Sequence, residues 1–128
     1  MSTNIVLIGA GEVGFNLSKF LSKENYDLTV IDVDPLKCSR IKNTIDARVI
    51  EGDGCSQRIL QKIDFTNVDF FLSLTKIDEV NLVASIIAKK LGAKNIITRL
   101  RNTEYIHSSA IVTPYEFGID HIIYPEKS

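Results

Sequence analysis

Tryptophan is absent from this chain of 128 residues, and cysteine, histidine and proline are scarce. Its two cysteines, Cys38 and Cys55, form no Cys-x-x-Cys pair; they are too few for a disulfide framework and favour a reducing, cytoplasmic setting. No apolar run approaches the roughly 20 residues of a membrane span, so we expect no membrane insertion. A formal net charge of −1 without a basic stripe argues against nucleic-acid binding. The N-terminus leads almost at once into an apolar run, so we expect no signal peptide.

Catalytic constellations are missing as well. His107 and His121 are the only histidines, and neither has a serine–acid pair or metal ligands near it in sequence. There is no His-x-x-x-His, no pair of catalytic carboxylates and no nucleophile elbow. A hydride-transfer enzyme also needs a catalytic domain over its cofactor, and one domain spanning residues 1–128 leaves no chain to build it. The sequence therefore predicts a protein that is not an enzyme.

Glycine is concentrated in the segment Gly9-Ala10-Gly11-Glu12-Val13-Gly14. This segment follows the apolar run 4–8 and precedes an amphipathic stretch, which predicts a strand, a tight turn and a helix start. A second apolar run, 27–31, ends on Asp32. Together these features form the dinucleotide-binding fingerprint. A tight strand–helix turn without any ligand is the alternative interpretation.

Each residue of the fingerprint has a chemical reason. Gly9 permits the sharp turn, Gly11 leaves room for a pyrophosphate, and Gly14 lets the helix approach the strand. The helix that starts at Glu12 and Val13 directs N–H groups and a partial positive charge at the phosphates. We expect the Asp32 carboxylate to accept hydrogen bonds from ribose hydroxyls and to disfavour a 2′-phosphate, so NAD(H) is favoured over NADP(H). Two nearby cations, Lys37 and Arg40, keep that preference from being absolute.

Strands and helices are predicted to alternate along the whole chain. The expected strands are 4–9, 27–32, 47–51, 68–75, 95–100 and 121–124, and the expected helices are 12–23, 35–43, a short one after Ser56, 79–91 and 105–117. Helical spacing places Val13, Phe20, Leu36 and Val83 among the inward-facing side chains. This pattern predicts a Rossmann-like, doubly wound α/β fold with a six-stranded parallel sheet in the order 3-2-1-4-5-6.

A ligand in such a sheet lies at the carboxyl ends of the strands, where the strand order reverses. Asp53, Thr75 and Arg99 follow or end strands there and are candidate contacts to adenine, ribose and phosphate. Asp53 is as well explained as a turn former and Thr75 as a strand-end or helix-cap hydroxyl. Arg99 and its neighbour Arg101 are as well explained by surface ion pairs. Three polar residues at the start of a helix, Asp78, Glu79 and Asn81, are mostly explained by the helix dipole.

The motifs taken in order resemble one family along the whole chain. They are Gly9-Ala10-Gly11-Glu12-Val13-Gly14, Val30-Ile31-Asp32, Gly52-Asp53-Gly54, Asp78-Glu79-Val80-Asn81-Leu82, Ile97-Thr98-Arg99 and 118–125. This set resembles the TrkA N-terminal domain, also called the RCK or KTN domain. The resemblance implies a cytosolic regulator of a membrane potassium channel or transporter that binds NAD(H), ATP or ADP, assembles as dimers and rings, and gates the pore. It also strengthens Thr75 and Arg99 as ligand contacts.

Two departures from the family qualify these expectations. Members that prefer ATP often carry an arginine inside the glycine loop, and here that position is Glu12. A carboxylate opposes additional phosphate charge, so NAD(H) is favoured over ATP. Many members continue past the last strand into a crossover helix and a C-terminal ligand domain, which this sequence does not include. We therefore expect a regulatory NAD(H)-binding module; the cofactor half of an NAD-dependent dehydrogenase and a sensor of another system remain as alternatives.

Overall fold

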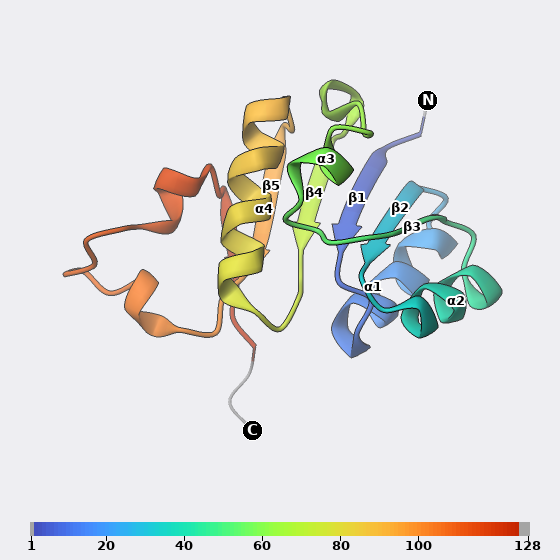
Figure 1. The fold of residues 1–128 in the computed structure, drawn as a ribbon, viewed down its shortest axis with the longest axis horizontal. Coiled ribbons are helices and arrows are strands. Elements are labelled where there is room, and N and C mark those ends of the chain that lie inside the picture. Colours follow the sequence, from blue (N-terminus) through green and yellow to red (C-terminus); the bar gives the residue numbers. More distant parts are fainter. Residues whose placement is uncertain (1, 126–128) are drawn as a thin grey trace.

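The computed structural model describes residues 2–125, and its six strands form one parallel sheet (Figure 1). The strands are β1 (Asn4–Ile8), β2 (Asp27–Asp32), β3 (Arg48–Glu51), β4 (Phe70–Ser73), β5 (Asn95–Arg99) and β6 (His121–Ile123). Their order is β3-β2-β1-β4-β5-β6, and every neighbouring pair is parallel. The predicted fold class and strand order are confirmed.

Within residues 2–125, four α-helices and three short 3-10 helices connect the strands. They are α1 (Glu12–Lys23), α2 (Pro35–Thr44), α3 (Gln57–Leu60), α4 (Asp78–Leu91), η1 (Phe65–Asn67), η2 (Thr103–Tyr105) and η3 (Pro114–Phe117). The ends of the helices follow local signals in the sequence. The Asp34 side chain caps α2 by accepting from the Leu36 amide at 2.9 Å, and Gly92 ends α4 with a left-handed φ of 110°.

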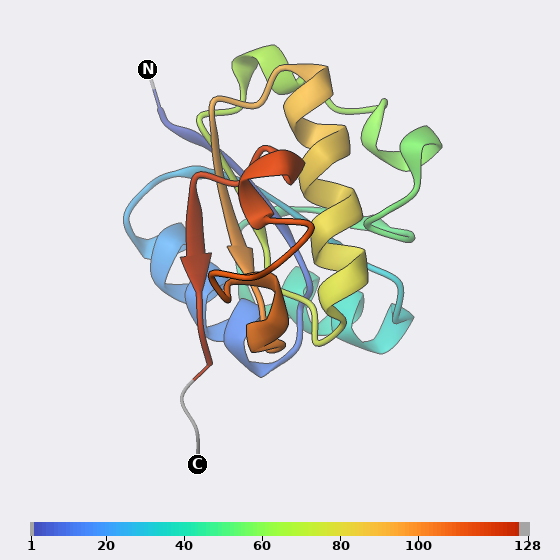
Figure 2. The same ribbon diagram turned by 90° about the vertical axis from the view of Figure 1, so that its left-hand side faces the viewer.

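The helices cover both faces of the sheet (Figures 1 and 2). On one face, α1 and α2 pack Phe15 and Ile41 against the strands. On the other, α3, η1 and α4 contribute a second cluster that includes Phe65 and Leu82. The central strands are therefore apolar on both sides, as parallel strands usually are. A ligand in such a sheet lies at the carboxyl ends of the strands.

Four side chains that helical spacing placed inward are exposed, and that part of the prediction is wrong. Their exposed fractions are Val13 44%, Phe20 59%, Leu36 79% and Val83 41%. In α1 the buried face is centred on Gly14 and Ser18, because Gly14 must lie against β1. Successive residues lie about 100° apart around a helix, so an error of one residue in the assumed inward position turns the predicted buried face by that angle. In α4 the buried face carries polar residues, which apolar periodicity cannot detect.

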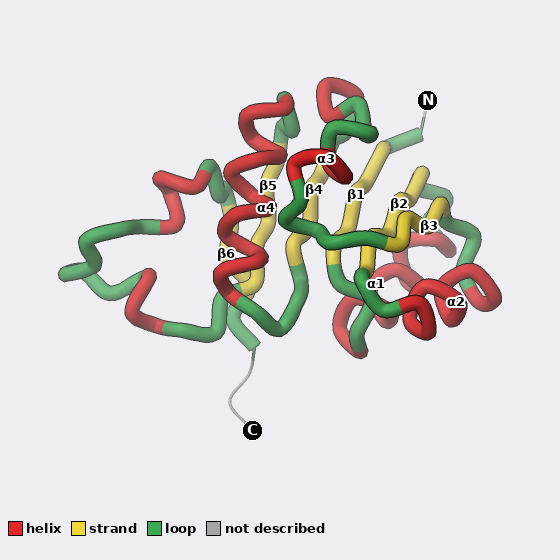
Figure 3. The backbone as a smooth tube through the Cα atoms, in the orientation of Figure 1, coloured by secondary structure: helices red, strands yellow, loops and turns green. Residues whose placement is uncertain are grey.

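The segment between β5 and β6 is mostly loop, whereas the sequence predicted a helix over 105–117 (Figure 3). Only η2 and η3 are helical there. Pro114 starts η3 because it has no N–H to continue an earlier helix. Side chains also take backbone groups away from a helix: the Ser109 amide donates to His107 Nδ1 at 3.2 Å, and the Thr113 amide donates to Glu116 Oε2 at 2.7 Å.

The contact between α1 and β1 is testable by Gly14→Ala. A Cβ atom at residue 14 would lie 1.7 Å from the Gly9 carbonyl oxygen. We expect a loss of about 3 kcal/mol in the free energy of unfolding, the upper end for overpacked cores, against a helix-propensity gain of only about 1 kcal/mol. Urea denaturation measures the difference. In the control Gly11→Ala, the new Cβ meets nothing within 4 Å; equal losses in the two variants would contradict the close contact.

Candidate functional site

A cavity of about 480 Å³ opens at the carboxyl ends of the central strands. It is lined by every predicted site residue except Gly14, namely Gly9, Gly11, Glu12, Val13, Asp32, Asp53, Thr75 and Arg99. Further lining residues that sequence reasoning had not assigned to the site include Val33, Ile77 and Val80. Apolar side chains at strand ends are hard to distinguish from core residues in a sequence. Segments from five separate parts of the chain thus meet at one site.

The three glycines of the loop occupy three different environments. Gly9 turns the chain off β1 with a φ of +101°, and a Cβ there would lie 3.0 Å from the Leu74 carbonyl carbon. At Gly11 a Cβ would meet no atom within 4 Å, because the residue faces the open cavity. Gly14 lies beneath the loop against Gly9. The loop therefore presents bare backbone to the cavity at Gly11.

The N-terminus of α1 adjoins this bare backbone. Gly11 is the N-cap residue, and no side chain caps the helix. The Phe15 amide begins the helical ladder by donating to the Gly11 carbonyl at 2.7 Å. The amides of the first turn precede that bond and lack intrahelical partners. This arrangement, with the helix dipole behind it, suits an anionic group such as a pyrophosphate.

Asp32 ends β2 and supports the glycine loop directly. Its Oδ2 accepts from the Ala10 amide at 2.7 Å, and its Oδ1 accepts from the Asp34 amide at 2.8 Å. An ionised carboxylate offers about four lone-pair sites, so each oxygen keeps one for a ligand hydroxyl. Asp32 thus fixes the loop as well as facing the cavity. Sequence reasoning had predicted the second role but not the first.

Asp53 forms a tight turn with Cys55 at the cavity rim. Its Oδ1 accepts from the Cys55 amide at 3.0 Å and from the Cys55 thiol at 3.1 Å. These hydrogen bonds lower the pKa of Asp53. Burial, followed by the hydrogen bond to Asp53, raises the pKa of the Cys55 thiol. The rim therefore carries a carboxylate and a protonated thiol near neutral pH, and the turn-forming role of Asp53 is present in the structure.

The Thr75 hydroxyl is largely occupied by its own chain. It lies 2.7 Å from Asn81 Oδ1, to which it donates, and it accepts from the Ile77 amide at 3.2 Å. One acceptor position remains for a ligand. Thr75 is therefore a strand-end hydroxyl bonded within the turn that leads into α4, and α4 itself has no side-chain cap. The residue also lines the cavity.

Cations approach the cavity from two sides. Lys37 and Arg99 line it, while Arg40 stacks its guanidinium 3.6 Å from the centre of the Phe15 ring. Within residues 2–125, Arg99 and Arg101 form no salt bridge. The surface ion pair that we considered for each arginine is therefore not found in this part of the chain. Arg99 presents a cation to the cavity, and Arg101 lies in a neighbouring hollow.

Two residues of α4 shape the site without lining it. Asn81 is 0% exposed, and its Nδ2 donates to the Thr75 carbonyl at 3.0 Å and to the Arg99 carbonyl at 2.9 Å. The buried Asp78 carboxylate accepts from the Arg101 and Asn102 amides. Sequence reasoning had explained both mainly by the helix dipole. The missed signal was their spacing, which places two polar groups on the same face of α4.

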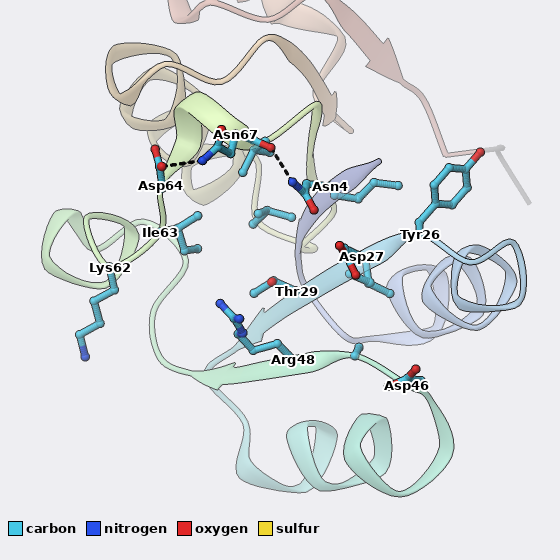
Figure 4. A pocket seen from close by; sticks show the side chains of 15 residues that line it. Asn4, Tyr26, Asp27, Thr29, Asp46, Arg48, Lys62, Ile63, Asp64 and Asn67 are labelled. Carbon is cyan, nitrogen blue, oxygen red and sulfur yellow. Dashed lines mark hydrogen bonds between the residues drawn. The ribbon is translucent and has the colours of Figure 1, made fainter. Parts of the chain in front are cut away.

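A second hollow, of about 560 Å³, lies at the opposite edge of the sheet (Figure 4). Thr29 and Arg48, which are paired in the register of β2 and β3, face it across from Ile63. At its rim, Asn4 Nδ2 donates to the Asn67 carbonyl at 2.8 Å and joins β1 to the segment before β4. This hollow has no glycine loop and no uncapped helix start. The glycine loop and the uncapped helix start therefore both lie at the carboxyl ends of the strands, not beside this second hollow.

The described residues, 2–125, contain neither a metal-binding cluster nor a helix suited to span a membrane. In this range, no cluster of three or more His, Cys, Asp or Glu side chains is arranged to hold a metal ion. None of the helices there is both long and apolar enough to cross a bilayer.

Curated relatives match almost the whole chain. A Trk system potassium uptake protein TrkA homolog from Archaeoglobus fulgidus is 38% identical over 124 residues, covering 97% of this chain and 28% of the relative. A protein of the same description from Methanothermobacter thermautotrophicus is 32% identical, covering 97% of this chain and 55% of the relative. The chain thus spans between about a quarter and just over half of the relatives it matches. Both are named for potassium uptake rather than for an enzymatic reaction.

Solved structures share the fold. The GsuK channel bound to NAD superposes with a TM-score of 0.78 at 13% identity, covering 96% of this chain and 21% of that chain. GsuK bound to ADP gives a TM-score of 0.77 at 13% identity, covering 97% and 31%. At such low identity these likenesses concern the fold alone. The family model described as the TrkA-N domain matches residues 5–125. With that match and the relatives above, the chain belongs to the TrkA-N domain family.

Proposed function

We propose that this chain is an NAD(H)-binding regulatory domain of a potassium uptake system. The observation that carries the proposal is the pairing of Gly11 and Asp32 at one cavity. Gly11 offers bare backbone beside an uncapped helix start, and Asp32 offers a fixed carboxylate at the end of the neighbouring strand. A dinucleotide needs both, one for its pyrophosphate and one for its ribose. The TrkA-N family and the potassium uptake relatives support the regulatory role.

The charges around the cavity favour NAD(H) among related nucleotides. Asp32 would meet the 2′-phosphate of NADP(H), and Glu12 lines the cavity where a further phosphate of ATP would bring negative charge. Lys37 also lines the cavity and moderates the discrimination against NADP(H). GsuK has been solved with NAD and with ADP, which supports both nucleotides as candidates in this fold. We therefore rank NAD(H) first and ADP or ATP second.

The proposed setting is the cytoplasmic side of a membrane, with a potassium transporter or channel subunit as the partner. The domain would act as a homo-oligomer, a dimer or a ring of dimers. Large apolar side chains on the segment between β5 and β6 support contacts with another chain, since Ile111 is 96% and Tyr115 85% exposed. Phe15, by contrast, belongs to the core. A nucleotide regulates such an assembly only through its different affinity for two states.

A dehydrogenase fragment is the competing function. Within residues 2–125 the cavity lining includes no histidine, and the carboxylates Asp32 and Asp53 are engaged by backbone amides. The proposed role is therefore non-catalytic. Sustained hydride transfer between NAD and simple alcohols or hydroxy acids by this chain alone would favour the enzyme.

Nucleotide preference is testable by thermal unfolding with NADH, NAD, ADP, ATP and NADPH. A ligand that binds only the folded state adds about 2.7 kcal/mol of stability when its free concentration is a hundred times Kd. We expect the largest shift in Tm from NADH or NAD, smaller shifts from ADP and ATP, and the smallest from NADPH. Calorimetric titration of the same ligands confirms the order. No shift with any of the five would contradict the proposed function.

The glycine loop is testable by Gly11→Val. The valine side chain would fill the space that we assign to the pyrophosphate, where no protein atom lies within 4 Å of the new Cβ. We expect NADH affinity to fall at least a hundredfold while the urea midpoint stays nearly unchanged. Gly11→Ala serves as the graded control, with a smaller loss. Wild-type affinity in the valine variant would place the ligand elsewhere.

The ribose contact is testable by Asp32→Ala. We expect NADH binding to weaken by about 1–3 kcal/mol, the cost of losing hydrogen bonds to a charged group, and the ratio of NADPH to NADH affinity to rise. The matched control is Asp34→Asn, which removes a neighbouring charge but keeps a good N-cap for α2. If both variants bind NADH equally well, the carboxylate of Asp32 does not contact the ligand.

A further inference from the structure

Helix α4 carries three polar residues on its buried face. Asp78, Asn81 and Ser85 are exposed by 7%, 0% and 0%. Buried polar groups persist in folded proteins when they have hydrogen-bond partners. Here the partners of Asp78 and Asn81 belong to the ends of β4 and β5 and to the residues that follow them.

The Asn81 side chain is saturated by its neighbours. Its Oδ1 accepts from the Ser73 hydroxyl at 3.0 Å, the Thr75 amide at 3.0 Å and the Thr75 hydroxyl at 2.7 Å. Its Nδ2 donates to the carbonyls of Thr75 and Arg99. Both amide hydrogens and the amide oxygen are used, so the orientation of the side chain is fixed by its partners. One side chain therefore joins the ends of two adjacent strands.

We propose that Asn81 is a positioning residue of the nucleotide cavity. It does not line the cavity, but Thr75 and Arg99 do, and Asn81 holds the backbone of both. The inference rests on the proposed function, because it concerns the same site. Binding is tighter when the contacting groups are already ordered in the free protein. Asn81 supplies that order for the two contacts that come from β4 and β5.

Asp78 bonds α4 to the backbone that follows Arg99. Its carboxylate accepts from the Arg101 amide at 2.9 Å and from the Asn102 amide at 2.7 Å. The backbone from residue 99 to residue 102 is thus bonded at both ends to the first two turns of α4. The Arg99 side chain extends from this fixed segment into the cavity, where it forms no salt bridge within residues 2–125. Helix α4 thus holds the backbone of Arg99, and the guanidinium has no carboxylate partner within residues 2–125.

The primary test is Asn81→Asp with Ser85→Ala as the matched control. Aspartate keeps the shape of Asn81 but turns an oxygen toward the carbonyls of Thr75 and Arg99, which repels both. Ser85 is equally buried one turn later and bonds to the Asn81 carbonyl and to Thr98, neither of which lines the cavity. We expect the Kd for NADH to rise at least tenfold in Asn81→Asp and to stay within twofold in Ser85→Ala, although both variants lose thermal stability.

A double-mutant cycle with Arg99→Met separates positioning from general destabilisation. If Asn81 acts through Arg99, its substitution weakens NADH binding much less in the Arg99→Met background than in the wild type. A merely structural role gives the same fold-change in both backgrounds, and that result would overturn the inference.

A measurement on the unmodified chain covers the case in which Asn81→Asp does not fold. We expect the two Asn81 side-chain NH₂ protons to exchange slowly with solvent before any NADH is added, because both are bonded to the carbonyls of Thr75 and Arg99. Rapid exchange of these protons in a chain that binds NADH would overturn the inference alone. Absence of NADH binding to the wild type would instead overturn the proposed function, and the inference with it.

Discussion

The approach of α1 to β1 is the contact on which the rest of the structure depends. At Gly14 there is no room for a single carbon atom against the Gly9 carbonyl. This closeness brings the uncapped start of α1 to the end of β1 and leaves Gly11 facing open space. The pyrophosphate site that we propose at the loop therefore follows from a packing constraint inside the fold. A larger residue at position 14 would displace the helix start before it touched any ligand.

Several residues hold the fold and line the cavity at the same time. Asp32 bonds the loop after β1, Asp53 bonds its own turn, and Thr75 is bonded by Asn81. From the sequence, Asp53 was either a turn former or a ligand contact, and Thr75 either a hydroxyl bonded within its own chain or a ligand contact. A residue that bonds its own chain and also lines the cavity is compatible with both roles. These side chains are thus held in place by the protein's own groups.

The predictable part of this protein is what local chemistry dictates. Short sequence patterns mark the glycine loop, the helix caps at Asp34 and Gly92 and the acidic end of β2. These patterns were enough to predict the fold and most of the residues that line the cavity. The inward face of α1 was misjudged because Gly14, with no side chain, defines it. Asn81 was missed because its partners, Thr75 and Arg99, meet it only once β4 and β5 are adjacent. The helix expected over 105–117 failed because proline and polar side chains compete with the helical backbone there.

A crystal structure of the chain with NADH tests the central claim most directly. The account predicts a dinucleotide across the ends of β1 and β2, with its pyrophosphate on the backbone of Gly11 and the first turn of α1, and its adenosine ribose on Asp32. Two results would contradict this account: an empty cavity at the carboxyl ends of the strands at saturating NADH, or a ligand bound in the hollow beside Thr29 and Arg48 at the opposite ends of the strands.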